Sequence, residues 1–594
     1  MPDKGSTRKS DPDLSEILDS ILSGRDREDF LGKVERLLNA ASDVLSDITP
    51  EKPKGAADGR SFVDTIGVIL TAAVDQPETL ARHWGSFAGS LLKVLRQQSD
   101  LMPDPADRRF RDDLWQESPL LRCLMQAYLA WEDHLGAWAD DQEFTEEDRR
   151  RVGFIFDQMV AALAPTNLPI NPVALKRAEK SAGMSAVAGI KNFIHDVRYN
   201  RAMPRQINPG AYRIGVDLAT TPGAVVLRTT EMELLQYGPQ TEKVRDRPLL
   251  LIPPQINKYY AFDLKPKNSI LGYLVRQGFQ VFTISWKNPD KGTSDWSIET
   301  YLGSIRQAVD AIRVITQNER INLISACAGG LTAMAFLGHL AETKDPIIES
   351  HSLLVTALLP QSGSMLELFT TDQTLELARE ISRAEGTLDG KDLAHVFAWL
   401  RPGDLIWTYW VNNYMLGRQP PPLDVLYWDN DPTRLPAALH SDFIDMYQND
   451  VFQRPGSQSL FGKPIDYANM QVDTYFVGGR EDYLMPWQSI YRAARLFDGQ
   501  HRFVLSTSGH VQSILRPPNL ANTEYFTNAD LPECSDQWLA EADRQDGTWW
   551  VDWTEWLNQR SGKVRPAPNR LGSSQYMPLD PAPGIYVTER MDFH

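Results

Sequence analysis

One cysteine lies in a setting that predicts covalent chemistry. Cys327 follows the apolar run Ile321-Asn-Leu-Ile-Ser and precedes a helical pattern, with small residues on both sides in Ser325-Ala-Cys-Ala-Gly. A nucleophile on a sharp turn between a strand and a helix needs small neighbours, so that the two elements can approach. The helix N-terminus would favour a thiolate, and the Ala328 N–H would face a developing oxyanion. The alternative is a buried structural cysteine in a tight turn.

Two further residues follow the cysteine in a meaningful order. Asp482 lies in Gly478-Gly-Arg-Glu-Asp and His510 in Ser506-Thr-Ser-Gly-His, each directly after a strand-like run. Of the ten histidines, only His510 follows a strand through a Ser-Gly turn, whereas His339 falls within a helical pattern. Nucleophile, acid and histidine in this order are typical of α/β-hydrolases. The order therefore favours a catalytic Cys327–His510–Asp482 set.

The elements around these residues predict the same fold class. The first 205 residues show helical periodicity, as in Ser15 to Leu22, Phe30 to Leu38, Leu120 to Leu135 and Val152 to Leu163. Strand-like runs then alternate with helical ones, which predicts a parallel sheet with right-handed crossovers. The expected strands are Pro248–Pro254, Phe279–Trp286, Ile321–Ser325, Ser352–Leu359, Val472–Gly478 and Arg502–Ser506.

A stretch rich in Trp, Tyr and Pro interrupts this alternation from about 360 to 464. Insertions of this kind lie over the carboxyl ends of the strands, where α/β sheets place their sites. We therefore predict an α/β-hydrolase fold with a helical lid at 360–464, in a catalytic domain at 206–594 that follows a mostly helical N-terminal domain at 1–205. Ordinary helical packing is the alternative for the insertion. About 12 N-terminal residues and Pro50–Gly55 are expected to be mobile.

Composition excludes several classes of function. The net charge of −17 disfavours nucleic acid as a partner, and the three cysteines are too few for a disulfide framework and match no zinc motif. No run of 18 apolar residues predicts a membrane span, and the first residues lack a signal-peptide core. These features predict a cytoplasmic protein without a metal. The aromatic residues of the N-terminal helices fit helix packing or, alternatively, an apolar contact surface.

Ordered motifs over more than 350 residues resemble the polyhydroxyalkanoate synthases. The single-chain type is implied, closest to class II (medium-chain-length) with class I as the near alternative, from Phe397-Ala-Trp-Leu-Arg, Thr433-Arg-Leu-Pro and Gly509-His-Val-Gln. The other matching motifs are Pro253-Pro-Gln-Ile-Asn-Lys, Ile284-Ser-Trp-Lys-Asn-Pro, Ala326-Cys-Ala-Gly-Gly, Trp410-Val-Asn-Asn-Tyr, Asp424-Val-Leu-Tyr-Trp, Arg480-Glu-Asp, Ser508-Gly-His and Gly547-Thr-Trp-Trp.

The resemblance assigns roles residue by residue. It implies Cys327, His510 and Asp482 as catalytic residues and the backbone N–H groups of Ala328 and Ile256 as oxyanion donors. It also implies a role of Trp428 in a dimer contact and of Gln512 in chain-length preference. At two positions the chain departs from the family: Tyr483 stands in place of the usual His, and Ser325 in place of the usual Gly, and both changes bear on specificity. The resemblance implies no cofactor.

The implied activity is polymerisation of (R)-3-hydroxyacyl-CoA, with release of CoA, through a thioester on Cys327. His510 would take the thiol proton and then activate the next 3-hydroxyl, with direct deprotonation by Asp482 as the open alternative. The implied partners are acyl-CoA, the growing polyester, its granule surface in the cytoplasm and a second copy of the chain. Cys123 and Cys534 are expected to be dispensable. A Cys-dependent thioesterase or dienelactone-type hydrolase and a non-catalytic granule-coat protein are the competing hypotheses.

Overall fold

The computed structural model describes residues 59–360, 363–518 and 520–589, and its centre is a sheet of ten strands. The strand order is β1-β2-β5-β4-β6-β7-β12-β13-β14-β15. The six strands from β5 to β13 are parallel, and the two outer strands on each side are antiparallel. The ten strands are β1 (Gly223–Arg228), β2 (Met232–Tyr237), β4 (Leu249–Ile252), β5 (Val281–Trp286), β6 (Ile321–Ala326), β7 (Ile348–Leu354), β12 (Asp473–Gly479), β13 (Arg502–Ser506), β14 (Glu524–Thr527) and β15 (Asp543–Asp546).

Helices cover both faces of this sheet, because alternate strand residues point to opposite sides. On β4, Leu250 and Ile252 belong to one apolar core, whereas Leu249 and Leu251 belong to the other. Helices α11, α12 and α18 contribute to the first core, and α10 and α21 contribute to the second. Their bounds, with those of two shorter helices, are α10 (Ile270–Arg276), α11 (Ile298–Thr316), α12 (Ala328–Thr343), α18 (Trp487–Ala494), α19 (His510–Ile514), α20 (Ser535–Glu541) and α21 (Trp549–Arg560).

The predicted α/β-hydrolase fold is confirmed, and one of the six predicted strands was misplaced. Strand β7 runs from Ile348 to Leu354, so the prediction that it begins at Ser352 and extends to Leu359 was wrong. Its first half is polar, and sequence hydropathy therefore misses it. Ser350 donates a hydrogen bond to Asn322 at 2.8 Å, and His351 pairs with Ser325 at 2.7 Å, which satisfies these side chains inside the sheet.

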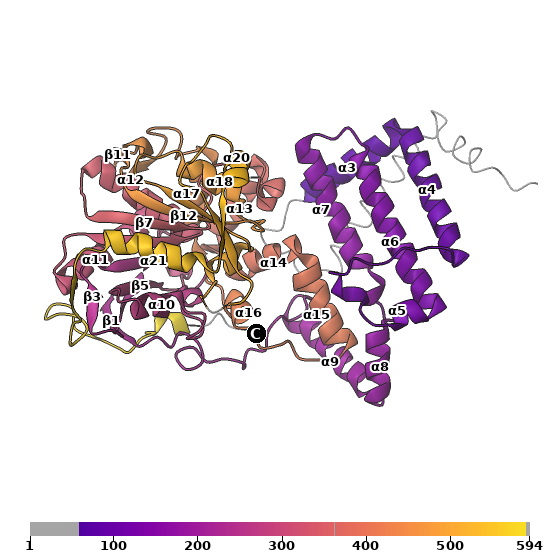
Figure 1. Cartoon of the computed structure of the whole chain (residues 1–594), viewed down its shortest axis with the longest axis horizontal. Coiled ribbons are helices and arrows are strands. Elements are labelled where there is room, and N and C mark those ends of the chain that lie inside the picture. The colour runs from indigo at the N-terminus through magenta and orange to yellow at the C-terminus, as the bar shows by residue number, and fades with distance from the viewer. Residues whose placement is uncertain (1–58, 361–362, 519, 590–594) are drawn as a thin grey trace, which may run out of the picture. The chain divides into compact units, whose positions relative to one another are not determined.

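Seven α-helices precede the sheet in the described part of the chain. Figure 1 shows α3, α4, α6 and α7 running alongside one another as a bundle. The predicted helices at 120–135 and 152–163 are confirmed, whereas the expectations for residues 1–55 lie outside the described residues. The seven are α3 (Gly59–Asp75), α4 (Pro77–Leu95), α5 (Leu114–Glu117), α6 (Pro119–Asp140), α7 (Glu146–Leu163), α8 (Pro172–Lys180) and α9 (Met184–Tyr199).

The segment between β7 and β12 is helical, as predicted. It contacts α9 closely, since a Cβ at Gly189 of α9 would lie only 1.9 Å from the Tyr414 carbonyl oxygen. Asn192 donates to the Asn413 carbonyl at 2.9 Å, and Tyr414 donates to buried Asp196 at 2.9 Å. The main elements of this segment are η5 (Met365–Phe369), α13 (Asp372–Glu385), α14 (Gly390–Leu400), the π-helical turn η6 (Gly403–Trp407), α15 (Thr408–Trp410), the π-helical turn η7 (Val411–Met415), α16 (Asp424–Asp429) and α17 (Ala437–Gln448).

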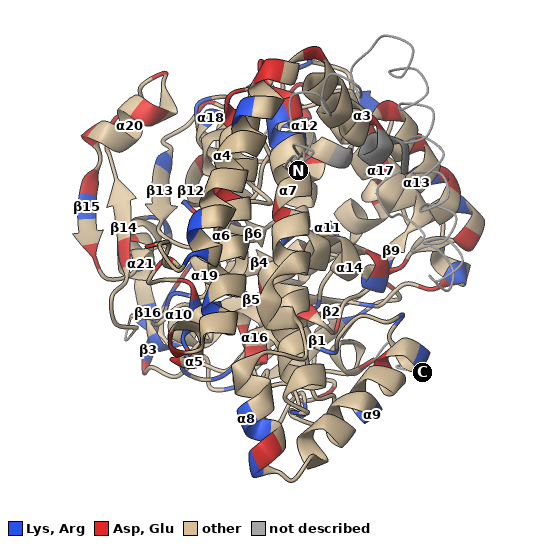
Figure 2. Cartoon of the chain, turned by 90° about the vertical axis from the view of Figure 1, so that its right-hand side faces the viewer, with Lys and Arg blue, Asp and Glu red and all other residues tan. Residues whose placement is uncertain are grey.

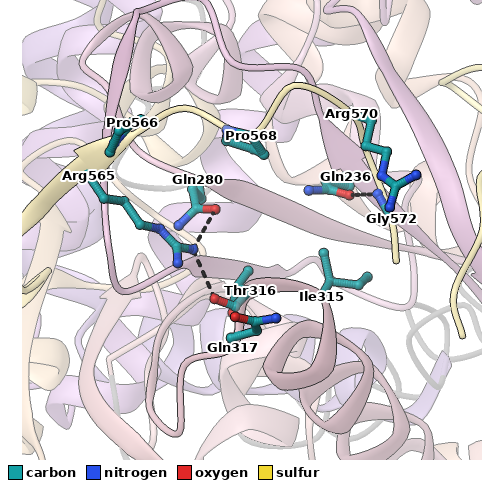
Figure 3. A pocket seen from close by; sticks show the side chains of 10 residues that line it. All are labelled: Gln236, Gln280, Ile315, Thr316, Gln317, Arg565, Pro566, Pro568, Arg570 and Gly572. Carbon is teal, nitrogen blue, oxygen red and sulfur yellow. Dashed lines mark hydrogen bonds between the residues drawn. The ribbon is translucent and has the colours of Figure 1, made fainter. Parts of the chain in front are cut away.

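The segment after α21 is hydrogen-bonded to residues in and beside the sheet. Figure 3 shows Arg565, which donates to Gln280 at 3.2 Å and to the Thr316 carbonyl at 2.9 Å. The Gly572 N–H donates to Gln236 at 2.6 Å. The small pocket between these side chains contains none of the predicted site residues. Among the described residues, no helix is both long and apolar enough to cross a membrane.

Candidate active site

Cys327 lies on a strained turn between β6 and α12. Its φ of 49° and ψ of −128° are unusual for a residue with a side chain, and strain of this kind is found at functional sites. The Cys327 N–H donates to the Leu354 carbonyl at 3.1 Å, which anchors the turn to β7. At Gly329, a Cβ would lie 2.6 Å from the Ile252 oxygen and from the Pro253 carbonyl, so only glycine permits this close approach of α12 to the end of β4.

Ser325, two residues before the cysteine, is fully buried at the end of β6. Its hydroxyl shares a hydrogen bond of 2.7 Å with Nε2 of His351 on the neighbouring strand. Burial lowers the pKa of His351 to about 3, so this imidazole is neutral at physiological pH. The Ser325 hydroxyl, which the sequence places near the Cys327 sulfur, is therefore hydrogen-bonded to His351 inside the sheet.

Asp482 and His510 lie together at the same edge of the sheet, after β12 and β13. His510 Nδ1 donates to Asp482 Oδ2 at 2.7 Å. The other carboxylate oxygen, Oδ1, accepts from the backbone N–H groups of Leu484 at 3.0 Å and Met485 at 2.9 Å. The Asp482 side chain has no exposed surface. Both of its oxygens are therefore occupied, and it is fixed as a partner of His510.

Burial and the neighbouring side chains shift the pKa of His510 in opposite directions. Burial lowers its pKa, but the charge and hydrogen bond of Asp482, followed by a hydrogen bond with Cys327, raise that pKa well above the ordinary value for histidine. Because Nδ1 of His510 is hydrogen-bonded to Asp482, the other ring nitrogen, Nε2, is the one available to the Cys327 sulfur. The structure thus brings together Cys327, His510 and Asp482, and the arrangement suits a thiolate held beside an imidazolium.

Two backbone N–H groups lie free near the nucleophile. Neither Ala328 N–H, at the first position of α12, nor Ile256 N–H donates to any acceptor among the residues that the structure describes. The loop of Ile256 is fixed from both sides, since Gln255 donates to Thr332 of α12 at 2.9 Å and the Thr433 N–H donates to the Ile256 carbonyl at 3.1 Å. Unpaired donors on a rigid loop are the groups that an oxyanion requires.

Tyr483 connects Asp482 to the helical insertion. The Arg401 guanidinium lies 5.5 Å from the centre of the Tyr483 ring, and the Met365 N–H donates to the Tyr483 carbonyl at 3.2 Å. Burial raises the pKa of Tyr483 to about 12, so its hydroxyl is protonated at neutral pH. Gln512, by contrast, is exposed, two residues beyond His510 on α19.

Trp428, the predicted dimer contact, is 6% exposed. Its indole N–H donates to the Lys258 carbonyl at 2.7 Å, and its ring belongs to the same apolar core as Leu249 and Leu251. A residue so buried has little surface for a direct contact with a second chain. Its effect on an interface would act through the loop that it holds, and the dimer stays a prediction.

Two features near the site were missed from the sequence. Lys258 and Asp431 form a buried ion pair at 2.7 Å, which ties the loop of Ile256 to the segment after α16. Asp429, the last residue of α16, is close enough to His510 and Tyr483 to interact with both electrostatically. Neither feature has a local motif, because both depend on contacts between segments far apart in the chain.

The chain is an α/β-hydrolase-fold protein with a cysteine on the turn between β6 and α12. Residues 248–517 match the family model described as alpha/beta hydrolase fold, and residues 106–274 match Poly-beta-hydroxybutyrate polymerase (PhaC) N-terminus. The chain is 42% identical to poly(3-hydroxyalkanoate) polymerases 1 and 2 of Ectopseudomonas oleovorans, over 89% and 90% of its length and 95% of each relative. It is 35% identical to the polymerase subunit PhaC of Cupriavidus necator, over 90% of this chain and 91% of that protein. The chain belongs to the poly(3-hydroxyalkanoate) polymerase family.

Proposed function

We propose that this chain polymerises (R)-3-hydroxyacyl-CoA into polyhydroxyalkanoate and releases CoA. The observation that carries the proposal is the hydrogen-bonded series Cys327–His510–Asp482 at the carboxyl edge of the sheet, in a chain of this family. A cysteine suits the reaction because the exchange of one thioester for another is nearly isoergic. A serine would form a more stable oxygen ester.

In the loading step, Cys327 attacks the thioester carbonyl of the substrate. His510 takes the thiol proton, and Asp482 orients the imidazole and stabilises its charged form. The N–H groups of Ala328 and Ile256 would stabilise the oxyanion, and loss of one such donor typically lowers kcat by about 10²–10³-fold. CoA leaves as the thiolate, and the acyl group stays on the sulfur.

We assign the helical segment 360–464 as a lid in a catalytic domain at 206–594, with residues 1–205 as the N-terminal domain. The contacts of Arg401 and the Met365 N–H with Tyr483 support this role, because they join the segment to the residue after Asp482. A cover over the acyl-enzyme protects the thioester from water. The attachment of the segment to α9 through Gly189 and Asn192 would fix one side of the lid.

A medium-chain-length preference is the specificity that we propose. It rests on the class II resemblance and on the higher identity to the Ectopseudomonas oleovorans relatives than to the Cupriavidus necator relative. Tyr483 and Gln512 are the candidate determinants, because Tyr483 directly follows Asp482 and Gln512 lies two residues after His510. Ser325 would act indirectly, through His351 and the turn at Cys327.

The surface of a polyester granule in the cytoplasm is the proposed place of action, with a homodimer as the proposed assembly. One face of α9 packs on the insertion, whereas the opposite face exposes apolar residues at helical spacing, each between 42% and 65% exposed. In Figure 2 the ribbon of α9 is tan along most of its length. An exposed apolar stripe suits contact with a hydrophobic phase. The stripe consists of Met184, Val187, Ile190, Ile194 and Val197.

CoA release from a series of 3-hydroxyacyl-CoA lengths, followed by sizing of the product, tests the proposal. We expect polymer and CoA from the wild-type chain, and neither from Cys327→Ala with its fold intact. Free hydroxy acid in place of polymer would identify a thioesterase. A folded chain that releases no CoA from any length would identify a non-catalytic coat protein, and CoA release by Cys327→Ala at the wild-type rate would refute the nucleophile.

A further inference from the structure

Helix α7 of the N-terminal bundle contacts the helical insertion at two places, beside η5 and beside η6. Nη2 of Arg150 donates to the Gly363 carbonyl at 2.6 Å and to the Ser364 carbonyl at 2.9 Å, just before η5. About two turns further along α7, Gln158 donates to the Trp399 carbonyl at 3.0 Å, near the end of α14. One helix of the bundle therefore holds two segments of the insertion that lie far apart in the chain.

Both of these segments contact Tyr483. Met365, the residue after Ser364, donates its backbone N–H to the Tyr483 carbonyl at 3.2 Å. Arg401, two residues after Trp399, places its guanidinium 5.5 Å from the centre of the Tyr483 ring. The backbone and the side chain of Tyr483 are thus each held by a segment that α7 fixes in turn.

The turn that contains Tyr483 also orients the catalytic acid. Oδ1 of Asp482 accepts hydrogen bonds from the backbone N–H groups of Leu484 at 3.0 Å and Met485 at 2.9 Å. Oδ2 of the same carboxylate accepts from Nδ1 of His510 at 2.7 Å. A shift of this turn would therefore move the carboxylate relative to the imidazole, and misplacement by about 1 Å can lower a rate by about 10²-fold.

We propose that Arg150 and Gln158 are positioning residues, which hold the turn of Tyr483 from the N-terminal bundle. Through this turn they fix the Asp482–His510 pair in the geometry that the reaction needs. The inference rests on the proposed function, and it gives the N-terminal bundle a part in the reaction itself. Arg150 should contribute more than Gln158, because its hydrogen bonds carry a charge and those of an amide do not.

The alternative is that these contacts only attach the bundle to the insertion and contribute stability alone. Arg149, the preceding residue on α7, provides a matched control, because its guanidinium donates to the Ala139 carbonyl at 3.2 Å and to the Gln142 carbonyl at 3.0 Å. These hydrogen bonds stay inside the bundle. Arg149→Ala therefore weakens the bundle without removing a contact to the insertion.

The experiment compares Arg150→Ala, Arg150→Lys and Arg149→Ala with the wild-type chain by three measurements. The first is kcat and KM for CoA release from a 3-hydroxyacyl-CoA, and the second is thermal unfolding. The third is the rate at which iodoacetamide alkylates Cys327 at neutral pH, followed on its peptide by mass spectrometry. Alkylation needs the thiolate that His510 stabilises, and it needs no acyl-CoA.

We expect Arg150→Ala to lower kcat by about tenfold with KM little changed, and to slow the alkylation of Cys327 by a similar factor. Arg150→Lys keeps a charged donor on a flexible side chain and should recover part of both rates. Arg149→Ala should lower the melting temperature but leave both rates unchanged below it. Gln158→Ala should cause a smaller loss in the same direction, and it provides the same test if Arg150→Ala does not fold.

Four outcomes would overturn the proposal: wild-type kcat and alkylation in folded Arg150→Ala, an equal loss in Arg149→Ala, a rise in KM alone, or no recovery by Arg150→Lys. The first and second would show that the contacts contribute stability only. A failure of the proposed function is distinguishable, since the wild-type chain would then form no polymer, whereas the alkylation of Cys327 would still report the effect of Arg150.

Discussion

Gly329→Ala tests whether the close approach of α12 to the end of β4 sets the geometry of the site. A Cβ at this position would lie 2.6 Å from the Ile252 oxygen and the Pro253 carbonyl, whereas ordinary contacts begin at 3.4 Å. The backbone must therefore move by about 0.8 Å, and both neighbours are themselves backbone atoms. The movement would separate the Ala328 N–H from the Ile256 loop, and misplacement by about 1 Å can lower a rate by about 10²-fold.

The assay is CoA release under kcat/KM conditions, with thermal unfolding as the measure of fold. Gly303→Ala in α11 is the matched control, because nothing lies within 4 Å of its Cβ position and alanine there favours the helix by up to about 1 kcal/mol. We expect kcat/KM to fall about 10²-fold in Gly329→Ala and to stay unchanged in Gly303→Ala. A folded Gly329→Ala protein with wild-type kcat/KM would show that this close approach does not set the geometry of the site.

Three further predictions follow from buried charges and histidines. Asp482→Asn should lower kcat by about 10⁴-fold with little change in melting temperature, since His510 loses the acceptor that orients it; a loss below tenfold would contradict this. His351 stays neutral in the fold, but the unfolded chain takes up a proton below about pH 6.5. Protonation of His351 in the unfolded chain should therefore lower the free energy of unfolding by about 2 kcal/mol between pH 6.5 and 5. Urea unfolding of His351→Gln should show a flatter pH dependence than the wild type, and the same pH dependence in both proteins would exclude this role. Lys258→Met should destabilise the chain by about 3–5 kcal/mol in chemical unfolding, because Asp431 is left buried and uncompensated; a stability unchanged within 1 kcal/mol would show that the pair contributes little.

The central strands could be predicted from the sequence because their apolar runs are buried on both faces. The runs around Leu250, Phe282 and Leu323 locate β4, β5 and β6 closely. Strands β1, β2, β14 and β15 were not predicted, since they lie at the margins of the sheet in antiparallel pairs, where pairing with a neighbour matters more than local hydropathy. The start of β7 was missed because Ser350 and His351 are satisfied by side chains from β6.

Some residues of the site could likewise be predicted from the sequence, and others could not. Cys327, Asp482 and His510 each follow a strand and stand out in the sequence, and the structure brings Asp482 and His510 within 2.7 Å. Lys258 and Asp431 match no local pattern, because their buried ion pair joins two segments that lie far apart in the chain. The engagement of the Ser325 hydroxyl by His351 likewise depends on the register between two strands.

The site of acyl attachment tests most directly whether Cys327 is the nucleophile. The chain is mixed with a 3-hydroxyacyl-CoA, quenched in acid within one turnover, digested and analysed by mass spectrometry. We expect one acyl group on the peptide that contains Cys327, labile to neutral hydroxylamine as a thioester is, and no such adduct in Cys327→Ala. Polymer formation with the acyl group on another residue, or with Cys327 never modified, would exclude Cys327 as the nucleophile.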